Sequence, residues 1–282
     1  MGESQIVVRL NPDTPPTGSD LSVVNAARRS FDTRSEWNWS KELESGTGDG
    51  RTLKPKDKRL LEFLARGMTA ADFTTFVSLM ASEVITGYEE WYDCKEDLVE
   101  KLWQWRNTPT HDTPFNHGFF SFEVKAPIFV ARHLVKHEYL IMSEYSRRYI
   151  TDDVEFYTPE VWRKAAKDVK QGSSSEAVGM YESLWGFANT DEDYCAHMKE
   201  GVYLYNHLIE QGVAPEQARM VLPQSLMTSW TWSGTLGAFA NMCRLRLNKD
   251  TQYETRLVAE SVYSELKKQF PVSAPLLVEG VF

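Results

Sequence analysis

The sequence contains few cysteines, and they form no recognisable metal-binding or redox motif. Cys94, Cys195 and Cys243 lie far apart in a chain of 282 residues, and no CxxC pair is present. Paired cysteines at that spacing mark structural zinc sites and dithiol redox sites, so neither is expected here. A sparse, odd-numbered set of cysteines also does not build a disulfide scaffold. We therefore expect a protein of the reducing cytoplasm.

Long apolar runs are also missing. No stretch approaches the roughly 18 apolar residues that a membrane-spanning helix requires. The chain starts with MGESQIVVRLNPDTPP, in which no basic region is followed by an apolar one. A secretion signal has that arrangement, so neither secretion nor a membrane partner is expected.

The third absence is an excess of positive charge. The formal net charge is -9 at pH 7, and the isoelectric point is about 5.3. Proteins that coat nucleic acid rely on a general positive field, so no nucleic-acid partner is expected. Any phosphate-binding site in this chain must be local, and clustered arginines therefore become informative.

The composition and the hydrophobic pattern predict a globular protein with both helices and strands. Hydrophobic residues make up 42% of the chain, enough to bury a sizeable core in one large domain or two small ones. We expect a helix from residue 20, capped by Asp20 or Ser22. The remaining expectations are strands over 5–10 and 118–131, a loop over 32–57, helices over 58–106, 180–212, 216–222 and 233–270 (the last with a break), and a flexible stretch at 172–175.

The segment KHEYLIMSEYSRRY, residues 136 to 149, places charged side chains between apolar ones. If residues 132–149 formed one helix, Arg132, Lys136, Ser143 and Arg147 would share a polar face. A solvated helix face is one interpretation. A phosphate site is the other, because guanidinium groups bind phosphate oxygens through two hydrogen bonds at once.

Two further chemistries fit this segment less well. His133 and His137, four residues apart, could bind a metal ion together with a carboxylate. However, Leu134 follows the first histidine, so the HExxH pattern is absent. Ser146 lies in no GxSxG turn, which argues against a nucleophilic serine. We predict no metal site.

Two other segments carry candidate side chains. Residues 111–117, HDTPFNH, gather polar side chains around a proline turn, which these side chains could themselves stabilise. Arg219, Arg244 and Arg246 lie in otherwise apolar helical patterns. Such an arginine either extends to water or binds an anion.

Taken in order, these segments resemble the flavin-dependent thymidylate synthase family, in particular its phage-type members. The family pattern is Arg-His-Arg, seven residues, Ser, one residue, then Arg-Tyr. Here Lys136-His137-Glu138 is followed at the same spacing by Ser146 and Arg148-Tyr149. HDTPFNH resembles the family's His-x-Thr-Pro-Phe-Glu-His, and the segments SVVNAARRSF, VKAPIFVAR, ARMVLP and LRLNKDTQYETR resemble other family segments.

The resemblance implies a fold, an assembly and a reaction. The fold class would be α/β (α+β), a twisted, mainly antiparallel sheet flanked by helices. One domain would span residues 1–282, with an inserted helical element at about 66–106. The protein would be a homotetramer with shared active sites, in the cytoplasm of a bacterium or a phage-infected host cell. The reaction would transfer a methylene group from methylenetetrahydrofolate to C5 of dUMP and reduce it to methyl, with FAD carrying hydride from NADPH.

Family roles can be carried over position by position. The catalytic residue would be Arg246, because a fixed positive charge beside uracil stabilises electron density pushed onto the carbonyl oxygens. Arg148 and Arg219 would bind the nucleotide phosphate. The full set of substrate-binding residues would be His133, Glu144, Ser146, Arg147, Arg148, Arg219 and Arg246. The cofactor-binding residues would be Ser30, Thr113, Asn116, Lys136, His137, Glu138, Thr235 and Asn241.

The chain departs from the family pattern mainly at the flavin-contacting positions. Lys136 and Glu138 stand where the family has arginine, Asn116 where it has glutamate and His133 where it usually has glutamine; Thr235 and Gly237 replace an asparagine and an arginine. Two alternatives therefore stay open. One is a diverged enzyme that modifies C5 of a pyrimidine nucleotide differently, such as a dUMP or dCMP hydroxymethylase. The other is a non-catalytic nucleotide or nucleic-acid binding protein on the same scaffold.

Overall fold

The structure is a computed structural model. It describes residues 5–39, 50–67, 70–81, 111–146, 148, 154–166, 173–178, 181–183, 186–188 and 190–279. The chain divides into two compact units. Unit 1 comprises Met1–Pro15, Ser121–Gly234 and Leu245–Val262, and unit 2 comprises Pro16–Phe120, Thr235–Arg244 and Tyr263–Phe282. Most of the predicted insertion at 66–106 lies outside the described residues, and the single domain over 1–282 stays a prediction.

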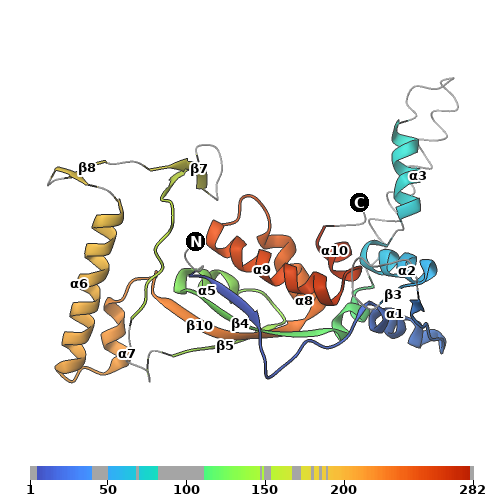
Figure 1. Cartoon of the computed structure of the whole chain (residues 1–282), viewed down its shortest axis with the longest axis horizontal. Coiled ribbons are helices and arrows are strands. Elements are labelled where there is room, and N and C mark those ends of the chain that lie inside the picture. The colour runs from blue at the N-terminus through green and yellow to red at the C-terminus, as the bar shows by residue number, and fades with distance from the viewer. Residues whose placement is uncertain are drawn as a thin grey trace. The chain divides into compact units, whose positions relative to one another are not determined.

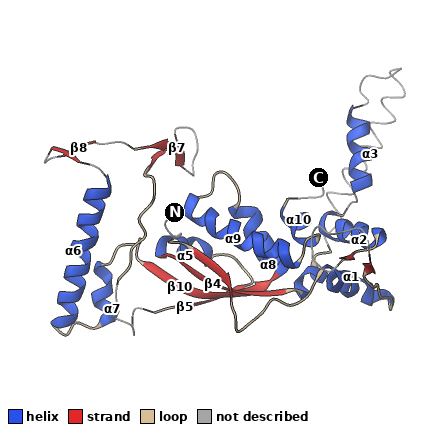
Figure 2. Ribbon diagram, in the orientation of Figure 1, coloured by secondary structure: helices blue, strands red, loops and turns tan. Residues whose placement is uncertain are grey.

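A four-stranded sheet provides the framework of unit 1 (Figures 1 and 2). The strand order is β1 (Val7–Leu10), β4 (Phe119–Pro127), β10 (Met227–Thr235) and β5 (Leu140–Glu144). β1 pairs antiparallel with β4, and β5 pairs antiparallel with β10. Phe122, Val124 and Trp232 are fully or almost fully buried, whereas intervening side chains are more exposed. This alternation is typical of a sheet with one face on a core.

The predicted strands at 5–10 and 118–131 are confirmed, but the second one is shorter than expected. Pro127 has an extended backbone and is the N-cap of α5 (Ile128–Leu134). The last residues of the predicted strand, 128–131, are therefore helical. β10 was not predicted, although TSWTWSGT alternates apolar and small polar residues. Residues 233–235, expected in a helix, are the end of this strand.

The condition of one helix over 132–149 is not met in the described residues of this segment. α5 ends at Leu134, a turn follows, and Tyr139 has a left-handed backbone with φ 63°. The next five residues pair with Trp230–Gly234 as β5. Pairing with a strand some ninety residues away therefore overrides the local helical pattern, and the calculated polar face does not exist.

The rest of unit 1 corrects two further expectations. The stretch 172–175 was expected to be flexible, but β7 (Ser173–Ala177) pairs with β6 (Arg163–Ala165). The predicted helix over 180–212 is confirmed only as α6 (Thr190–Glu210). The residues before α6 form the pair β8 (Tyr181–Ser183) and β9 (Gly186–Ala188). α7 (Pro215–Ala218) and η3 (Arg219–Val221) lead to β10.

Unit 2 is mainly helical. Its elements include α1 (Asp20–Arg28), η1 (Arg29–Phe31), β2 (Asn38–Trp39), β3 (Arg51–Thr52), α2 (Pro55–Arg66), α3 (Ala70–Ala81), η2 (Thr113–His117) and α10 (Ser273–Val278). β2 and β3 pair inside the segment expected to be a loop. α8 (Leu236–Arg246) and α9 (Tyr253–Gln269) have residues in both units and confirm the two helices predicted over 233–270.

The cap of α1 differs from the prediction. Ser19 is the N-cap: its Oγ accepts from the Ser22 N–H at 3.4 Å, while the Ser22 Oγ accepts from the Ser19 N–H at 2.8 Å. This is a capping box. Asp20 has another role, because its buried carboxylate accepts from the N–H groups of Val272 and Ser273. Burial raises the pKa of the Asp20 carboxyl, and these hydrogen bonds oppose that shift.

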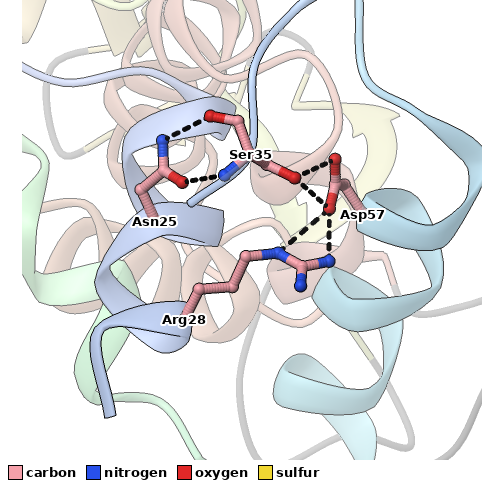
Figure 3. A network of polar contacts seen from close by, with 4 residues as sticks. All are labelled: Asn25, Arg28, Ser35 and Asp57. Atoms are coloured by element: carbon pink, nitrogen blue, oxygen red, sulfur yellow. Dashed lines mark hydrogen bonds and ion pairs between the residues drawn. The ribbon is translucent and has the colours of Figure 1, made fainter. Parts of the chain in front are cut away.

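A buried polar network joins α1 to α2 in unit 2 (Figure 3). Asp57, fully buried, accepts from Arg28 Nη2 at 2.6 Å and from Ser35 Oγ at 2.8 Å. Asn25 Oδ1 accepts from the Ser35 N–H at 2.7 Å, and Asn25 Nδ2 donates to the Ser35 carbonyl at 3.1 Å. A buried carboxylate requires such partners, so the network fixes how the two helices pack.

The predicted α/β fold class, with antiparallel sheets and flanking helices, is confirmed. Within the described part of the chain, no helix combines the length and the apolar composition needed to cross a membrane.

Candidate functional site

A cavity of about 430 Å³ in unit 1 brings together four of the predicted substrate-binding residues. It is lined by Glu144 and Ser146 at the end of β5, by Arg148, and by Arg219 of η3. The other lining residues are Ile128, Tyr145, Leu222, Leu226, Met227 and Thr228. About seventy residues separate Arg219 from the other three, so the fold creates this grouping.

Short-range hydrogen bonds orient the polar side chains of this cavity. Thr228, which is buried on β10, donates from Oγ1 to Glu144 Oε1 at 2.9 Å. Ser146 Oγ lies 3.3 Å from Arg148 Nε and 3.4 Å from the Arg148 backbone N. The Tyr145 N–H donates to the Ser229 carbonyl at 2.8 Å, which holds this end of β5 on β10. The carboxylate and one guanidinium are thus positioned by their neighbours.

Together these groups can recognise a molecule with an anionic end and a hydrogen-bond donor. Arg148 and Arg219 are both exposed. Each guanidinium group can form two hydrogen bonds at once to phosphate oxygens. Arg219 donates from Nε to the Glu216 carbonyl at 3.3 Å. Glu144, when ionised, can only accept hydrogen bonds, so it suits a hydroxyl or a ring N–H. A nucleotide carries both kinds of group.

Arg246 and His137 form a second pair of predicted site residues in unit 1. Arg246, at the end of α8, donates from Nε to His137 Nε2 at 2.9 Å. Burial, with the nearby charges of Arg246 and His133, lowers the pKa of His137 to about 4. His137 is therefore neutral at pH 7 and accepts through an unprotonated Nε2. Within the described residues, the two NH2 groups of Arg246 have no other hydrogen-bond partner.

The side chain of His133, a candidate metal ligand in the sequence, contacts Thr255. Its Nδ1 lies 3.1 Å from Thr255 Oγ1, and burial lowers its pKa. His133 is in α5 but His137 is in the turn beyond it, so they do not share a helical face. Among the described side chains, no three His, Cys, Asp or Glu residues lie close enough to hold a metal ion.

The predicted cofactor-binding residues lie in both units. Lys136 and Glu138 are exposed in the turn between α5 and β5. In unit 2, Thr235 Oγ1 donates to Asn116 Oδ1 at 2.7 Å, and a Cβ on Gly237 would come within 2.6 Å of the same oxygen. Three residues that differ from the family pattern, Asn116, Thr235 and Gly237, are therefore neighbours in the fold. The remaining members are Ser30 in η1, Thr113 in η2 and Asn241 in α8.

These residues suit the flavin that the resemblance implies. The exposed hydroxyls of Ser30 and Thr113 and the amides of Asn116 and Asn241 are neutral donors and acceptors, which ring nitrogens, carbonyls and hydroxyls of a flavin need. The Asn116 amide fills the space beside Gly237. The arginine that the family has at this position would therefore fit only if Asn116 moved.

Arg147, the remaining predicted site residue, lies outside the described residues. Two site residues were not predicted, namely Thr228, which orients Glu144, and Thr255, which contacts His133. Thr228 stands in the alternating pattern of β10, so recognising that strand would have placed it beside β5. Nothing in the local sequence marks Thr255.

The sequence matches a protein family over nearly its full length. A model of the family described as thymidylate synthase complementing protein matches residues 14–272. The flavin-dependent thymidylate synthase of Thermus thermophilus is 37% identical over 180 residues, covering 61% of this chain and 62% of that protein. The enzyme of the same name from Ehrlichia ruminantium is 35% identical over 175 residues, covering 60% and 56%. The chain thus spans about three fifths of the length of these relatives.

A solved structure shares the fold. It is a UMP/dUMP methylase from Streptomyces cacaoi bound with 5-Br dUMP, with a TM-score of 0.62 and 22% sequence identity. The similarity covers 96% of this chain and 94% of that one.

Proposed function

Because the chain belongs to the family of thymidylate synthase complementing proteins, we propose that it is a flavin-dependent thymidylate synthase that converts dUMP to dTMP. One observation carries the proposal: Glu144, Ser146, Arg148 and Arg219 line a single cavity. The volume of that cavity, about 430 Å³, is within the range of small-molecule sites. Relatives that are 30–37% identical carry this enzyme's name, which supports the assignment.

In this proposal, the nucleotide phosphate binds between Arg148 and Arg219. Ser146, within 3.3 Å of Arg148 Nε, holds that guanidinium in place. Glu144, oriented by Thr228, accepts a hydrogen bond from the sugar or the base. His133, Arg147 and Arg246 complete the proposed substrate-binding set.

Arg246 is the proposed catalytic residue. Its Nε–H is engaged by neutral His137, so its two NH2 groups remain for a carbonyl oxygen of uracil. A fixed positive charge there stabilises negative charge on that oxygen as electron density moves toward C5. Half-burial of Arg246 strengthens this effect, because fewer water molecules screen the charge.

FAD is the proposed cofactor, held by Ser30, Thr113, Asn116, Lys136, His137, Glu138, Thr235 and Asn241. When bound, it would supply the hydride that reduces the transferred methylene group to methyl. Methylenetetrahydrofolate would provide the carbon and NADPH the reducing equivalents. We further propose a homotetramer whose subunits share active sites.

The test is a visible absorption spectrum of the purified protein followed by a product assay. We expect flavin absorption bands, and dTMP from dUMP, methylenetetrahydrofolate and NADPH. Protein that carries no flavin, takes up none and yields no dTMP would contradict the proposal. UMP belongs in the same assay, because the structural relative from Streptomyces cacaoi is described as acting on UMP and dUMP.

A second candidate is a pyrimidine nucleotide C5-modifying enzyme with a different product, such as a hydroxymethylase of dUMP or dCMP. Asn116, Thr235 and Gly237 favour it, because these neighbouring residues differ in type from the family pattern at or beside predicted cofactor positions. Mass analysis of the product separates the candidates, since a hydroxymethyl group has one more oxygen atom than a methyl group.

A further inference from the structure

Tyr139 has a backbone conformation that tyrosine rarely adopts. Its φ is 63°, in the left-handed region that glycine and asparagine occupy at lower conformational cost. The residue is also 83% exposed, so its ring adds little to the packing of unit 1. Within the described residues the ring has no hydrogen-bond or ring partner. Among the described residues of unit 1, no contact of the ring therefore offsets the cost of placing a tyrosine here.

The fold fixes the position of Tyr139 on both sides. Before it, the His137 N–H donates to the Leu134 carbonyl at 3.1 Å and closes the turn after α5. After it, Leu140 is paired with Gly234 in the sheet. A Cβ on Gly234 would lie 2.5 Å from Leu140 Cδ2 and 3.0 Å from the Tyr139 carbonyl oxygen, so glycine permits this close approach. The ring is consequently displayed from a backbone that is held in place.

Tyr139 stands in the same turn as three residues that the proposed function assigns to the flavin, and next to one of them. Lys136, His137 and Glu138 precede it directly, and His137 is hydrogen-bonded to Arg246. We propose that Tyr139 is a binding residue whose ring stacks on the flat isoalloxazine ring of the flavin, an inference that rests on the proposed function. Aromatic rings attract one another in offset-stacked geometry, and Tyr139 presents a ring that the fold leaves exposed.

The experiment measures FAD affinity by fluorescence titration of the full chain after removal of bound flavin. Tyr139→Phe keeps the ring, whereas Tyr139→Gly and Tyr139→Asn remove it and suit the left-handed backbone. We expect Tyr139→Phe to bind FAD within about twofold of the unchanged protein. The Gly and Asn variants should bind about tenfold more weakly, in line with the loss of one ring stack, and bound flavin should be less quenched. Their thermal midpoints without flavin should be equal or higher, because the conformational cost is removed.

Tyr203 provides a matched control. It lies on α6 and is 74% exposed, so Tyr203→Ala removes an exposed tyrosine far along the same chain. This variant should bind FAD as the unchanged protein does.

The possible results separate this inference from the proposed function. If the unchanged protein binds no FAD, the proposed function fails and the inference falls with it. If the unchanged protein binds FAD and the Gly and Asn variants bind it equally well, only the role of Tyr139 is wrong. Light scattering of the same variants gives a second check. If their oligomeric state changes while their FAD affinity does not, the ring contacts a second copy of the chain, and the proposed role of Tyr139 is again wrong.

Discussion

At the residue scale, burial of His137 determines the charge of the hydrogen-bonded pair that it forms with Arg246. The low pKa of His137 means that this bond joins a cation to a neutral acceptor rather than two cations. The single positive charge of the pair therefore stays on Arg246, with its NH2 groups available.

We predict that Arg246→Ala abolishes dTMP formation while FAD remains bound, because the variant loses the charge that stabilises the uracil oxygen. Turnover and the flavin absorption spectrum of the same preparation check this. Arg9→Ala is the control, since Arg9 is an exposed residue of unit 1 whose ion pair with Glu123 contributes little. Full activity of Arg246→Ala would remove the catalytic assignment.

We predict that Arg148→Ala weakens dUMP binding by about 10- to 100-fold, because a hydrogen bond to a charged group contributes roughly 1.5–3 kcal/mol. Isothermal titration calorimetry with dUMP measures the change. Lys125→Ala serves as the control, since it removes an exposed cation of unit 1 that is paired with Glu155. An unchanged Kd for Arg148→Ala would place the phosphate elsewhere.

We predict that stability falls as the pH decreases from about 6.5 to 4. The pKa of His137 in the folded protein is about 4, below the ordinary value of 6.5, so the unfolded chain binds more protons in this window. Thermal unfolding at several pH values should therefore show a falling midpoint. His137→Gln should reduce this slope, whereas His197→Gln, at an exposed position of α6, should not. Equal slopes for all three proteins would contradict the neutral state of His137.

At the scale of elements, the network around Asp57 joins α1 to α2. We predict that Asp57→Ala lowers the free energy of unfolding by about 3–5 kcal/mol, since Arg28 and Ser35 lose a buried partner. Asp57→Asn should cost less, because it keeps a hydrogen-bond acceptor. Denaturant titration measures both.

The matched control for Asp57 is an exposed carboxylate. Glu176 pairs with Lys164 on the surface, so Glu176→Ala should change the free energy of unfolding by less than about 1 kcal/mol. A similar cost for Glu176→Ala and Asp57→Ala would mean that burial does not set the strength of the network.

At the scale of the whole molecule, we predict a homotetramer. Exposed large apolar side chains, among them Trp39, Ile141 and Met220, are the kind of surface that subunit contacts cover. Light scattering should then give a mass of about 130 kDa, four times 32.4 kDa. If sites are shared, specific activity should fall on dilution as the tetramer dissociates. A mass of 32.4 kDa at all concentrations would contradict the prediction.

Local patterns carried much of the fold and of the site. The residues QIVVRL predict the short strand β1. Alternation predicts most of β4, and helical periodicity predicts α6 and α9, because each pattern records which side of one segment is buried. The motif resemblance predicts Glu144, Ser146, Arg148 and Arg219 as site residues, and all four line one cavity. Within the described residues, local patterns failed where a distant segment decides the conformation. β5 forms because β10 pairs with it, and Ser19 caps α1 while Asp20 turns to Val272 and Ser273.

The sequence by itself determined the family and the side-chain types at the candidate site, since the order and spacing of motifs are properties of the chain alone. Only the tertiary structure decided that His137 meets Arg246, 109 positions away, and that Thr228 orients Glu144. It also decided that His137 is neutral, because desolvation depends on every segment packed around a group. Contacts between distant residues, and the desolvation of a particular side chain by them, arise from segments far apart along the chain, and no local pattern encodes them.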